Sequence, residues 1–167
     1  KYEKYPNVRF VKYKTKEYCK AIATVKYLVN NVSFPSYFLK REGQVLIDTW
    51  HGTPLKNMGF DIPGANISQG NTARNLFSAD YIVSSGPYMT EAAYKKSYKM
   101  QNLYEGTVLE EGFPRNDKLF NSDRAEVIQR LQDCGVEVTA DKKVILYAPT
   151  WRGEQYSTPD TDLQDVY

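Results

Sequence analysis

The single histidine of the chain, His51, belongs to the residue type that exchanges a proton near neutral pH. It follows the apolar run Val45-Leu46-Ile47 and precedes Gly52 and Pro54. An apolar run of this length is typical of a buried strand, and Gly and Pro end regular structure. His51 is therefore expected in a loop at the carboxyl end of a strand. There it could accept a proton from a substrate hydroxyl, or it could organise the loop through hydrogen bonds.

Basic residues occur in similar positions. Lys56, Arg115 and Arg152 lie in three polar loops, residues 49–56, 112–117 and 149–153, each of which follows an apolar run. Lys and Arg bind phosphate oxygens through their charge or through paired hydrogen bonds, although a single one beside a turn is more often a surface charge. If the strands are parallel, all three loops meet at one edge of the sheet, where α/β proteins bind ligands.

Two pairs of residues within these loops have two interpretations each. Asn116 and Asp117 either contribute to a site or cap a short helix that begins there. Trp50 and Trp151 either stack on a ring of a ligand or pack in the protein core. The residue types alone leave both alternatives open.

The elements that must position these loops alternate along the chain. Strands are predicted over residues 27–29, 45–47, 81–83, 107–109 and 144–148, the last being the clearest. Helices are predicted after an N-cap at Thr15, over residues 72–77, from Pro87 to about Tyr98, and from an N-cap at Ser122 to Gly135. This alternation favours an α/β fold with a mostly parallel sheet and right-handed crossovers.

Length and composition fit an ordinary folded domain. The chain has 167 residues, of which 41% are hydrophobic and 25% are charged, and no apolar run is long enough to predict a membrane span or a signal peptide. Residues 1–44 contain ten Lys or Arg and three Asp or Glu, whereas residues 121–167 contain five and nine. The basic front could meet an anionic membrane surface, an anionic polymer or nucleic acid, or it could be a solvated face.

The cysteines and the C-terminal residues give weaker predictions. Cys19 and Cys134 lie far apart and in no paired motif, so we expect reduced, buried thiols in a cytosolic protein, with neither a zinc site nor a disulfide. Residues 154–167 contain little that is apolar and are expected to be poorly ordered. No metal or other cofactor is expected.

The three loops also carry a resemblance to a known family. They are similar to successive signatures of the CDP-glycerol glycerophosphotransferases, the primases and polymerases of wall teichoic acid, and residues 29–35 resemble a weaker upstream segment of that family. The matching segments are Thr49-Trp50-His51-Gly52-Thr53-Pro54-Leu55-Lys56, Gly112-Phe113-Pro114-Arg115-Asn116-Asp117 and Leu146-Tyr147-Ala148-Pro149-Thr150-Trp151-Arg152.

The resemblance implies a GT-B architecture, in which two Rossmann-like halves face a cleft. The front half receives a lipid-linked glycerol phosphate acceptor, the back half holds CDP-glycerol, and the acceptor hydroxyl attacks the glycerol-bearing phosphorus and expels CMP. In this scheme His51 is the catalytic base. The residues expected to bind substrate or phosphate are Thr53, Lys56, Arg115, Asn116, Asp117 and Arg152. An anionic membrane surface is a further expected partner, and nucleic acid is not.

The resemblance also predicts what the chain lacks. Family members carry a second essential histidine and a donor-binding segment after the Ala-Pro-Thr-Trp-Arg signature, and this sequence has His51 alone. We therefore expect residues 1–121 to form the Rossmann-like acceptor-side domain and residues 122–167 to begin a truncated nucleotide-binding domain, in a fragment that is inactive alone. The expected location is cytoplasmic, peripheral on the inner face of the cell membrane.

Two other functions remain open at this point. One is the transfer of ribitol phosphate or another polyol phosphate by the same type of enzyme. The other is a non-catalytic module that binds an anionic polymer or a membrane, in which His51 is purely structural.

Overall fold

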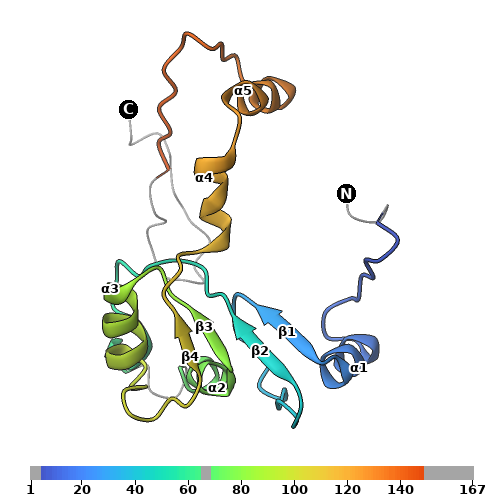
Figure 1. Cartoon of the computed structure of the whole chain (residues 1–167), viewed down its shortest axis with the longest axis vertical. Helices are drawn as coiled ribbons and strands as arrows, with labels where there is room; N and C mark the ends of the chain where they lie inside the picture. Colours follow the sequence, from blue (N-terminus) through green and yellow to red (C-terminus); the bar gives the residue numbers. More distant parts are fainter. Residues whose placement is uncertain (1–4, 65–68, 149–167) are drawn as a thin grey trace. The chain divides into compact units, whose positions relative to one another are not determined.

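The sheet that was predicted from the apolar runs is present and parallel. The computed structural model describes residues 5–64 and 69–148. Its four strands lie in the order β1-β2-β3-β4 and all run in the same direction (Figure 1). Their bounds are β1, Tyr27–Asn30; β2, Val45–Asp48; β3, Tyr81–Val83; and β4, Thr107–Leu109. The predicted α/β fold class is therefore confirmed.

Helices α1 and α2 form where the sequence predicted them. In α1, Lys16–Thr24, the hydroxyl of the N-cap residue Thr15 accepts a hydrogen bond from the N–H of Tyr18, as a capping threonine should. This helix buries Ile22 against the core. Helix α2 spans Gly70–Ser78, slightly more than the predicted residues 72–77.

The helix predicted from Pro87 changes type along its length. It begins as α3, Pro87–Met89, and continues as the π-helix η2, Thr90–Ser97. The wider turn is visible in the bond from the N–H of Tyr98 to the carbonyl oxygen of Ala93, which is 2.9 Å long. The hydroxyl of Tyr94 donates to the carbonyl of Val83 over 2.8 Å and ties η2 to β3.

The connection between β1 and β2 contains no helix and is held instead by α2. The N–H of Phe34 donates to Oδ1 of Asn75 over 2.8 Å, and Nδ2 of Asn71 donates to the carbonyl oxygen of Phe34 over 2.9 Å. Arg74 donates to the carbonyl oxygens of Pro35 and Phe38. These bonds satisfy buried backbone groups of a segment without regular structure, so that Phe34 and Phe38 can enter the core.

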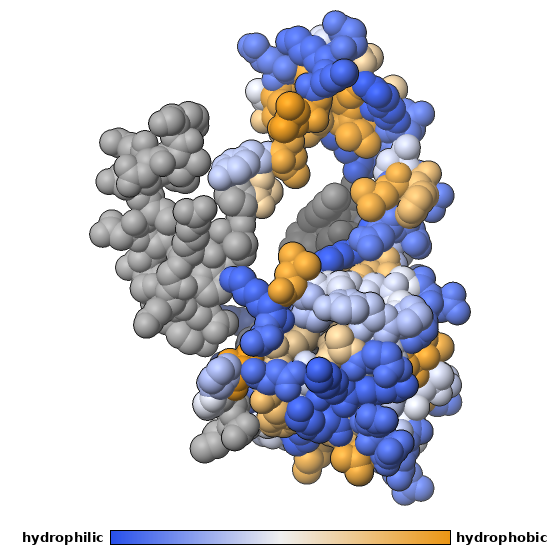
Figure 2. Space-filling view, turned by 90° about the vertical axis from the view of Figure 1, so that its left-hand side faces the viewer, coloured by the Kyte–Doolittle hydropathy of each residue, from blue (hydrophilic) through white to orange (hydrophobic). Residues whose placement is uncertain are grey.

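The main hydrophobic core combines residues of the sheet, the helices and these connections. Its buried members are Ile22, Leu28, Phe34, Phe38, Leu46, Trp50, Ala73, Leu76, Ala79, Ile82, Val83, Met89, Ala93, Tyr94, Tyr98, Met100 and Phe113. Outside this core, much of the surface that faces the viewer in Figure 2 is hydrophilic. In the described ranges no helix has both the length and the apolar character needed to cross a membrane.

The chain divides into two compact units, Lys1–Phe120 and Asn121–Tyr167. The first ends with the 3₁₀ turn η3, Pro114–Asn116, and most of α4, Asp117–Asn121. The second contains α5, Arg124–Asp133, whose N-cap is Asp123 rather than the predicted Ser122. Oδ1 of Asp123 accepts the N–H of Glu126 over 3.0 Å. The helix ends before Gly135, as predicted, at a φ of 85° that suits glycine.

Two predictions are wrong in this region and in α1. Residues 144–148 form no strand, and Ile145 and Leu146 are 92% and 85% exposed. A strand needs a neighbour for its backbone bonds, and the described part of the second unit contains no other strand. Cys19 and Cys134 are exposed rather than buried, because Cys19 lies on α1, which buries only Ile22, and Cys134 is the C-cap of α5, which buries none of its residues. The predicted tail, residues 154–167, lies outside the described residues.

Candidate functional site

The loop after β2 presents His51 to solvent. Nδ1 of the imidazole lies 2.7 Å from the carbonyl oxygen of Asn31, the residue that follows β1. A carbonyl oxygen only accepts hydrogen bonds, so Nδ1 carries the hydrogen and Nε2 is the basic nitrogen of the neutral ring. The main chain of one strand end thus fixes the tautomer of a side chain from the next.

The ring of Trp50 packs against the imidazole of His51, and its burial decides between the two interpretations given above for Trp50. Its ring is 6% exposed and belongs to the core, which is the packing interpretation rather than the ligand-stacking one. The ring stacks on that of His51, with 4.6 Å between centroids and 21° between planes. Its edge contacts are with Tyr94 of η2 and with Tyr98, the C-cap residue of η2, at 6.4 and 6.0 Å between centroids. Trp151 lies outside the described residues.

Arg115 reaches the same place from the loop after β4. A cavity of about 150 Å³ is lined by Asn31, Thr49, Trp50, His51, Phe113, Pro114 and Arg115. The guanidinium carbon of Arg115 lies 5.7 Å from the ring centroid of buried Phe113, and Nη2 would be 3.4 Å from a Cβ placed on Gly52. The structure therefore brings residues of the 49–56 and 112–117 loops together around one small cavity.

The other candidate residues lie outside the lining of that cavity. Thr53 Oγ1 is 2.7 Å from Oγ of Ser85, which joins the ends of β2 and β3, and Lys56 is exposed further along the same loop. Asn116 and Asp117 lie in η3 and at the start of α4, so the predicted short helix is present there. Arg152 and its loop lie outside the described residues.

Sequence reasoning missed Asp48, which is the last residue of β2 and is 3% exposed. Its Oδ1 accepts the N–H of Trp50 over 2.8 Å. Burial raises the pKa of Asp48 to about 6, although the Trp50 N–H and the charge of His51 act in the opposite direction. The available signal was an acidic residue that directly extends the apolar run Val45-Leu46-Ile47.

The described residues contain no group of three or more His, Cys, Asp or Glu side chains that could hold a metal ion. The side chains that line the cavity could transfer a proton at His51 and stabilise negative charge through Arg115.

Comparison with known proteins places these observations in a family. The family model of CDP-glycerol:poly(glycerophosphate) glycerophosphotransferases matches residues 3–166. The teichoic acid poly(glycerol phosphate) polymerase of Staphylococcus epidermidis is 36% identical over 154 residues, which are 87% of this chain and 21% of that protein. The teichoic acid ribitol-phosphate polymerase TarK of Staphylococcus aureus is 29% identical over 123 residues, 71% of this chain and 20% of that one.

The fold agrees with this assignment. The structure of a His-to-Asn variant of the wall teichoic acid polymerase TagF, soaked with CDPG, superposes with a TM-score of 0.73 and 33% identity, over 94% of this chain and 40% of that one. The similarity confirms the expected α/β architecture as part of a GT-B type protein. The chain spans about a fifth of each polymerase compared by sequence above. With a family match along almost its whole length, this chain belongs to the CDP-glycerol:poly(glycerophosphate) glycerophosphotransferases.

Proposed function

We propose that this chain is the acceptor-side part of a glycerophosphotransferase that moves glycerol phosphate from CDP-glycerol to a lipid-linked (poly)glycerol phosphate acceptor. The names of its relatives support both substrates, since one is a poly(glycerol phosphate) polymerase and another was soaked with CDPG. The observation that carries the proposal is an exposed imidazole with Nδ1–H fixed by Asn31 beside the guanidinium of Arg115.

The reaction uses each group for one task. Nε2 of His51 accepts the proton of the terminal acceptor hydroxyl, and the hydroxyl oxygen forms a bond to the glycerol-bearing phosphorus of CDP-glycerol. The bond from that phosphorus to the CMP oxygen breaks, and CMP leaves as an anion. The positive charge of Arg115 stabilises the phosphate oxygens while the charge is redistributed.

The volume of the cavity supports the proposal that this half binds the acceptor and the other half binds the nucleotide. Its volume of about 150 Å³ is below the roughly 300–1,000 Å³ of sites that enclose drug-sized ligands. It suits the small end of a glycerol phosphate chain. We accordingly assign residues 1–121 to the acceptor-side domain and residues 122–167 to the beginning of the nucleotide-binding domain, and we expect this chain to be inactive alone.

The remaining candidates are assigned to substrate on weaker grounds. Thr53, Lys56, Asn116 and Asp117 follow β2 and β4 at the edge that carries His51, and Arg152 belongs to the third signature segment. We propose that they contact phosphate or glycerol groups along the acceptor or donor. Their support is their place in the family signatures.

Replacing His51 tests the base directly. In the full-length gene product, His51→Ala should reduce CMP release from CDP-glycerol by about 10³-fold or more, the upper part of the range for general bases. Lys95→Ala is the matched control, because Lys95 lies on η2 and pairs there with exposed Glu91. Activity of His51→Ala within about tenfold of wild type would contradict the proposal and favour a binding module in which His51 is structural.

Ribitol phosphate is the second candidate substrate, supported by the 29% identity to a ribitol-phosphate polymerase. Glycerol phosphate is favoured because the identity to a glycerol-phosphate polymerase is 36%. CMP release measured with CDP-glycerol and CDP-ribitol in parallel should favour the glycerol nucleotide. A preference for CDP-ribitol would make ribitol phosphate the proposed substrate and glycerol phosphate the second candidate.

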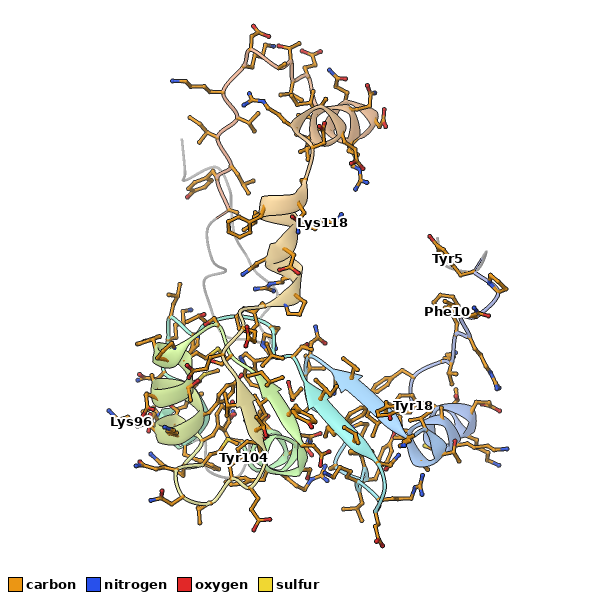
Figure 3. All side chains as sticks on the ribbon, viewed as in Figure 1. Tyr5, Phe10, Tyr18, Lys96, Tyr104 and Lys118 are labelled. Carbon is orange, nitrogen blue, oxygen red and sulfur yellow. The ribbon has the colours of Figure 1, made fainter. Side chains whose placement is uncertain are left out.

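We further propose that the protein works on the inner, cytoplasmic face of the membrane. Arg9, Lys16 and Lys20 line a groove of about 560 Å³ along α1. Phe10 and Tyr13 beside it are 61% and 57% exposed, and Figure 3 labels Phe10 on the segment before α1. Anionic headgroups contribute up to about 1 kcal/mol per nearby Lys or Arg, and exposed aromatic rings favour the interface.

Vesicles containing phosphatidylserine test this attachment. Binding should weaken as salt rises, and Lys16→Glu with Lys20→Glu should reduce it, whereas Lys142→Glu with Lys143→Glu is the matched control in the second unit. Binding that is insensitive to salt would contradict the electrostatic account.

A further inference from the structure

The buried carboxylate of Asp48 binds the backbone of Trp50, the residue whose ring stacks on the candidate base. Asp48 ends β2, a central strand, and pairs in register with Asn30 of β1 and Ile82 of β3. It is therefore enclosed on both sides by neighbouring strands and is 3% exposed. Buried acidic groups are rare unless a partner compensates for the lost hydration, so the contacts of this carboxylate need an explanation.

One contact leads to the backbone of Trp50. Oδ1 of Asp48 accepts the Trp50 N–H over 2.8 Å, and Trp50 has a φ of 49°, a left-handed conformation that is uncommon for an aromatic residue. The hydrogen bond holds the chain in this turn. The turn places the Trp50 ring in the core, with its face against the imidazole of His51 at 4.6 Å. Asp48 thus reaches His51 through one intervening residue.

The charge of Asp48 provides the second link. An asparagine could accept the same Trp50 N–H, but only a carboxylate attracts a positive imidazole, and His51 and Asp48 do attract each other. When His51 takes the acceptor proton, its ring becomes a cation that this negative charge attracts. A buried charge is screened far less by water than one at the surface, so the attraction is retained.

We infer that Asp48 is a positioning residue for His51, which acts through the Trp50 backbone to hold the imidazole and through its negative charge to stabilise the protonated ring. The inference rests on the proposed role of His51 as the base. Three contacts would then fix the imidazole of His51. The carbonyl oxygen of Asn31 binds Nδ1, the ring of Trp50 stacks on the imidazole, and Asp48 accepts the N–H of Trp50.

The groups that interact with Asp48 include three tyrosine phenols, which keep their charge constant near neutral pH. Tyr94 in η2, Tyr98 at its C-cap and Tyr104 before β4 all interact electrostatically with Asp48, and burial raises the pKa of each phenol, to about 12 for Tyr98. These three phenols therefore stay neutral between about pH 5 and pH 9. Within this group of phenols and Asp48, changes of charge in that range come from Asp48. The pKa of Asp48, about 6, means that its carboxylate is charged at neutral pH.

Two substitutions separate the two parts of the role. Asp48→Asn keeps an oxygen for the Trp50 N–H and removes the charge. Asp48→Leu removes both and places an apolar side chain in a buried site. In the full-length gene product we expect kcat at pH 8 to fall about tenfold in Asp48→Asn and about 10²-fold in Asp48→Leu, with KM for CDP-glycerol within about twofold of wild type. Asp80→Asn, at the other end of the sheet, is the matched control and should leave kcat unchanged.

Imidazole nitrogen NMR gives a readout that does not depend on activity. Because His51 is the only histidine of the 167-residue chain, its ring gives one pair of nitrogen signals. Wild type and Asp48→Asn should both show the hydrogen on Nδ1, whereas Asp48→Leu should show a mixture of tautomers. A wild-type spectrum for Asp48→Leu would overturn positioning through Trp50.

The possible kinetic results are distinct. Wild-type kcat in Asp48→Asn would overturn the role of the charge, and wild-type kcat in Asp48→Leu would overturn the whole inference while leaving His51 as the base. Loss of the proposed function itself would appear differently, as an active His51→Ala enzyme. Reduced kcat in both Asp48 variants, with Asp80→Asn unaffected, would support the inference.

Discussion

An aspartate lies at each end of β2: Asp48 is its last residue, and Asp80 binds its amino end. The surroundings of the two carboxyl groups shift their pKa values in opposite directions. At the amino end, Oδ2 of Asp80 accepts the N–H of Leu46 and Oδ1 accepts Nζ of Lys40, both over 2.7 Å. Burial alone would raise the pKa of Asp80, but these bonds outweigh it and leave the pKa below its usual value. At the carboxyl end, burial dominates and the pKa of Asp48 rises to about 6.

The difference separates stability from chemistry. The ionised form of Asp80 is stabilised by the fold, so this carboxylate helps to hold β2 and β3 together. The ionised form of Asp48 is disfavoured by the fold, and its neighbour is the candidate catalytic base. We therefore expect removal of the Asp80 charge to destabilise the fold without altering the reaction, and removal of the Asp48 charge to stabilise the fold while slowing the reaction, which is the usual trade-off at functional sites.

After His51→Ala, the largest effect is expected for Arg115 at the carboxyl end. Arg115→Ala should lower kcat/KM for CMP release by about 10²- to 10³-fold, because a positive charge next to the transferred phosphate is lost. Arg115→Lys should recover part of the rate, since it restores the charge without the planar fork. Steady-state kinetics of the full-length gene product measure both. An unchanged kcat/KM in Arg115→Ala would remove Arg115 from the site.

The next largest effect is expected at the amino end, where Gly106 precedes β4. A Cβ at Gly106 would lie 2.3 Å from the Tyr104 hydroxyl and 2.7 Å from the carbonyl oxygen of Ala79. Figure 3 labels Tyr104 beside the start of these strands. Gly106→Ala should reduce the free energy of unfolding by about 2–3 kcal/mol, measured by urea denaturation.

Gly70→Ala is the matched control for that change. Among the described residues, no atom beyond the chain neighbours and the backbone of α2 lies within 4 Å of a Cβ at Gly70. Because Gly70 begins α2, the stability of Gly70→Ala should equal or slightly exceed that of wild type. Equal stability in the two variants would show that the amino end can relax around the new methyl group.

A third prediction concerns the pH dependence of stability at Asp48. A carboxyl whose folded pKa is raised from 3.8 to about 6 adds stability below its unfolded pKa and loses it as pH rises through about 6. A two-unit shift corresponds to about 3 kcal/mol. Asp48→Asn should therefore be about 2 kcal/mol more stable than wild type at pH 8, a little less than the full shift because the amide brings new donors into the core.

Urea unfolding at pH 8 and pH 4 measures this prediction. The advantage of Asp48→Asn should vanish at pH 4, where wild-type Asp48 is itself protonated. A variant that is less stable than wild type at both values would show that the fold compensates the buried charge.

The smallest effect is expected for Asp80→Asn, with the opposite sign. Because the folded pKa of Asp80 is lowered, its contribution is present above the unfolded pKa and is lost as pH falls through the lower folded value. The variant should lose about 1 kcal/mol of stability at pH 7, the value of one hydrogen bond with a partly exposed ion pair. The same unfolding experiment near pH 3 should show a smaller difference.

Local sequence signals predicted the parts of the fold that depend on local interactions. The runs 27–29, 45–47, 81–83 and 107–109 all became strands, and Thr15 capped α1, because burial and capping act within a few residues. The run 144–148 has the same pattern and forms no strand, since a strand also depends on a neighbour that may be distant in the sequence. The π-helix η2 likewise had no local signal.

The candidate site was predictable in its location and less so in its supports. The loop pattern placed His51 and Arg115 at the same edge of the sheet, and the structure places both on one cavity. The carbonyl of Asn31 and the carboxylate of Asp48 were not predictable, because a backbone oxygen has no sequence signature and Asp48 reads as the polar end of a strand. Contacts that support a site residue in this way depend on how the ends of two strands are arranged in space.

The bond between His51 and Asn31 has a consequence for variation in this family. Its acceptor is a peptide oxygen, so the side chain at position 31 can change without altering which imidazole nitrogen is basic. What must persist is the course of the chain as it leaves β1. The side chain of Asn30 controls that course, since it accepts the N–H groups of Asn31 and Val32 over 3.0 and 3.3 Å. In a mutational scan, we therefore expect many residues to be tolerated at position 31 and few at position 30.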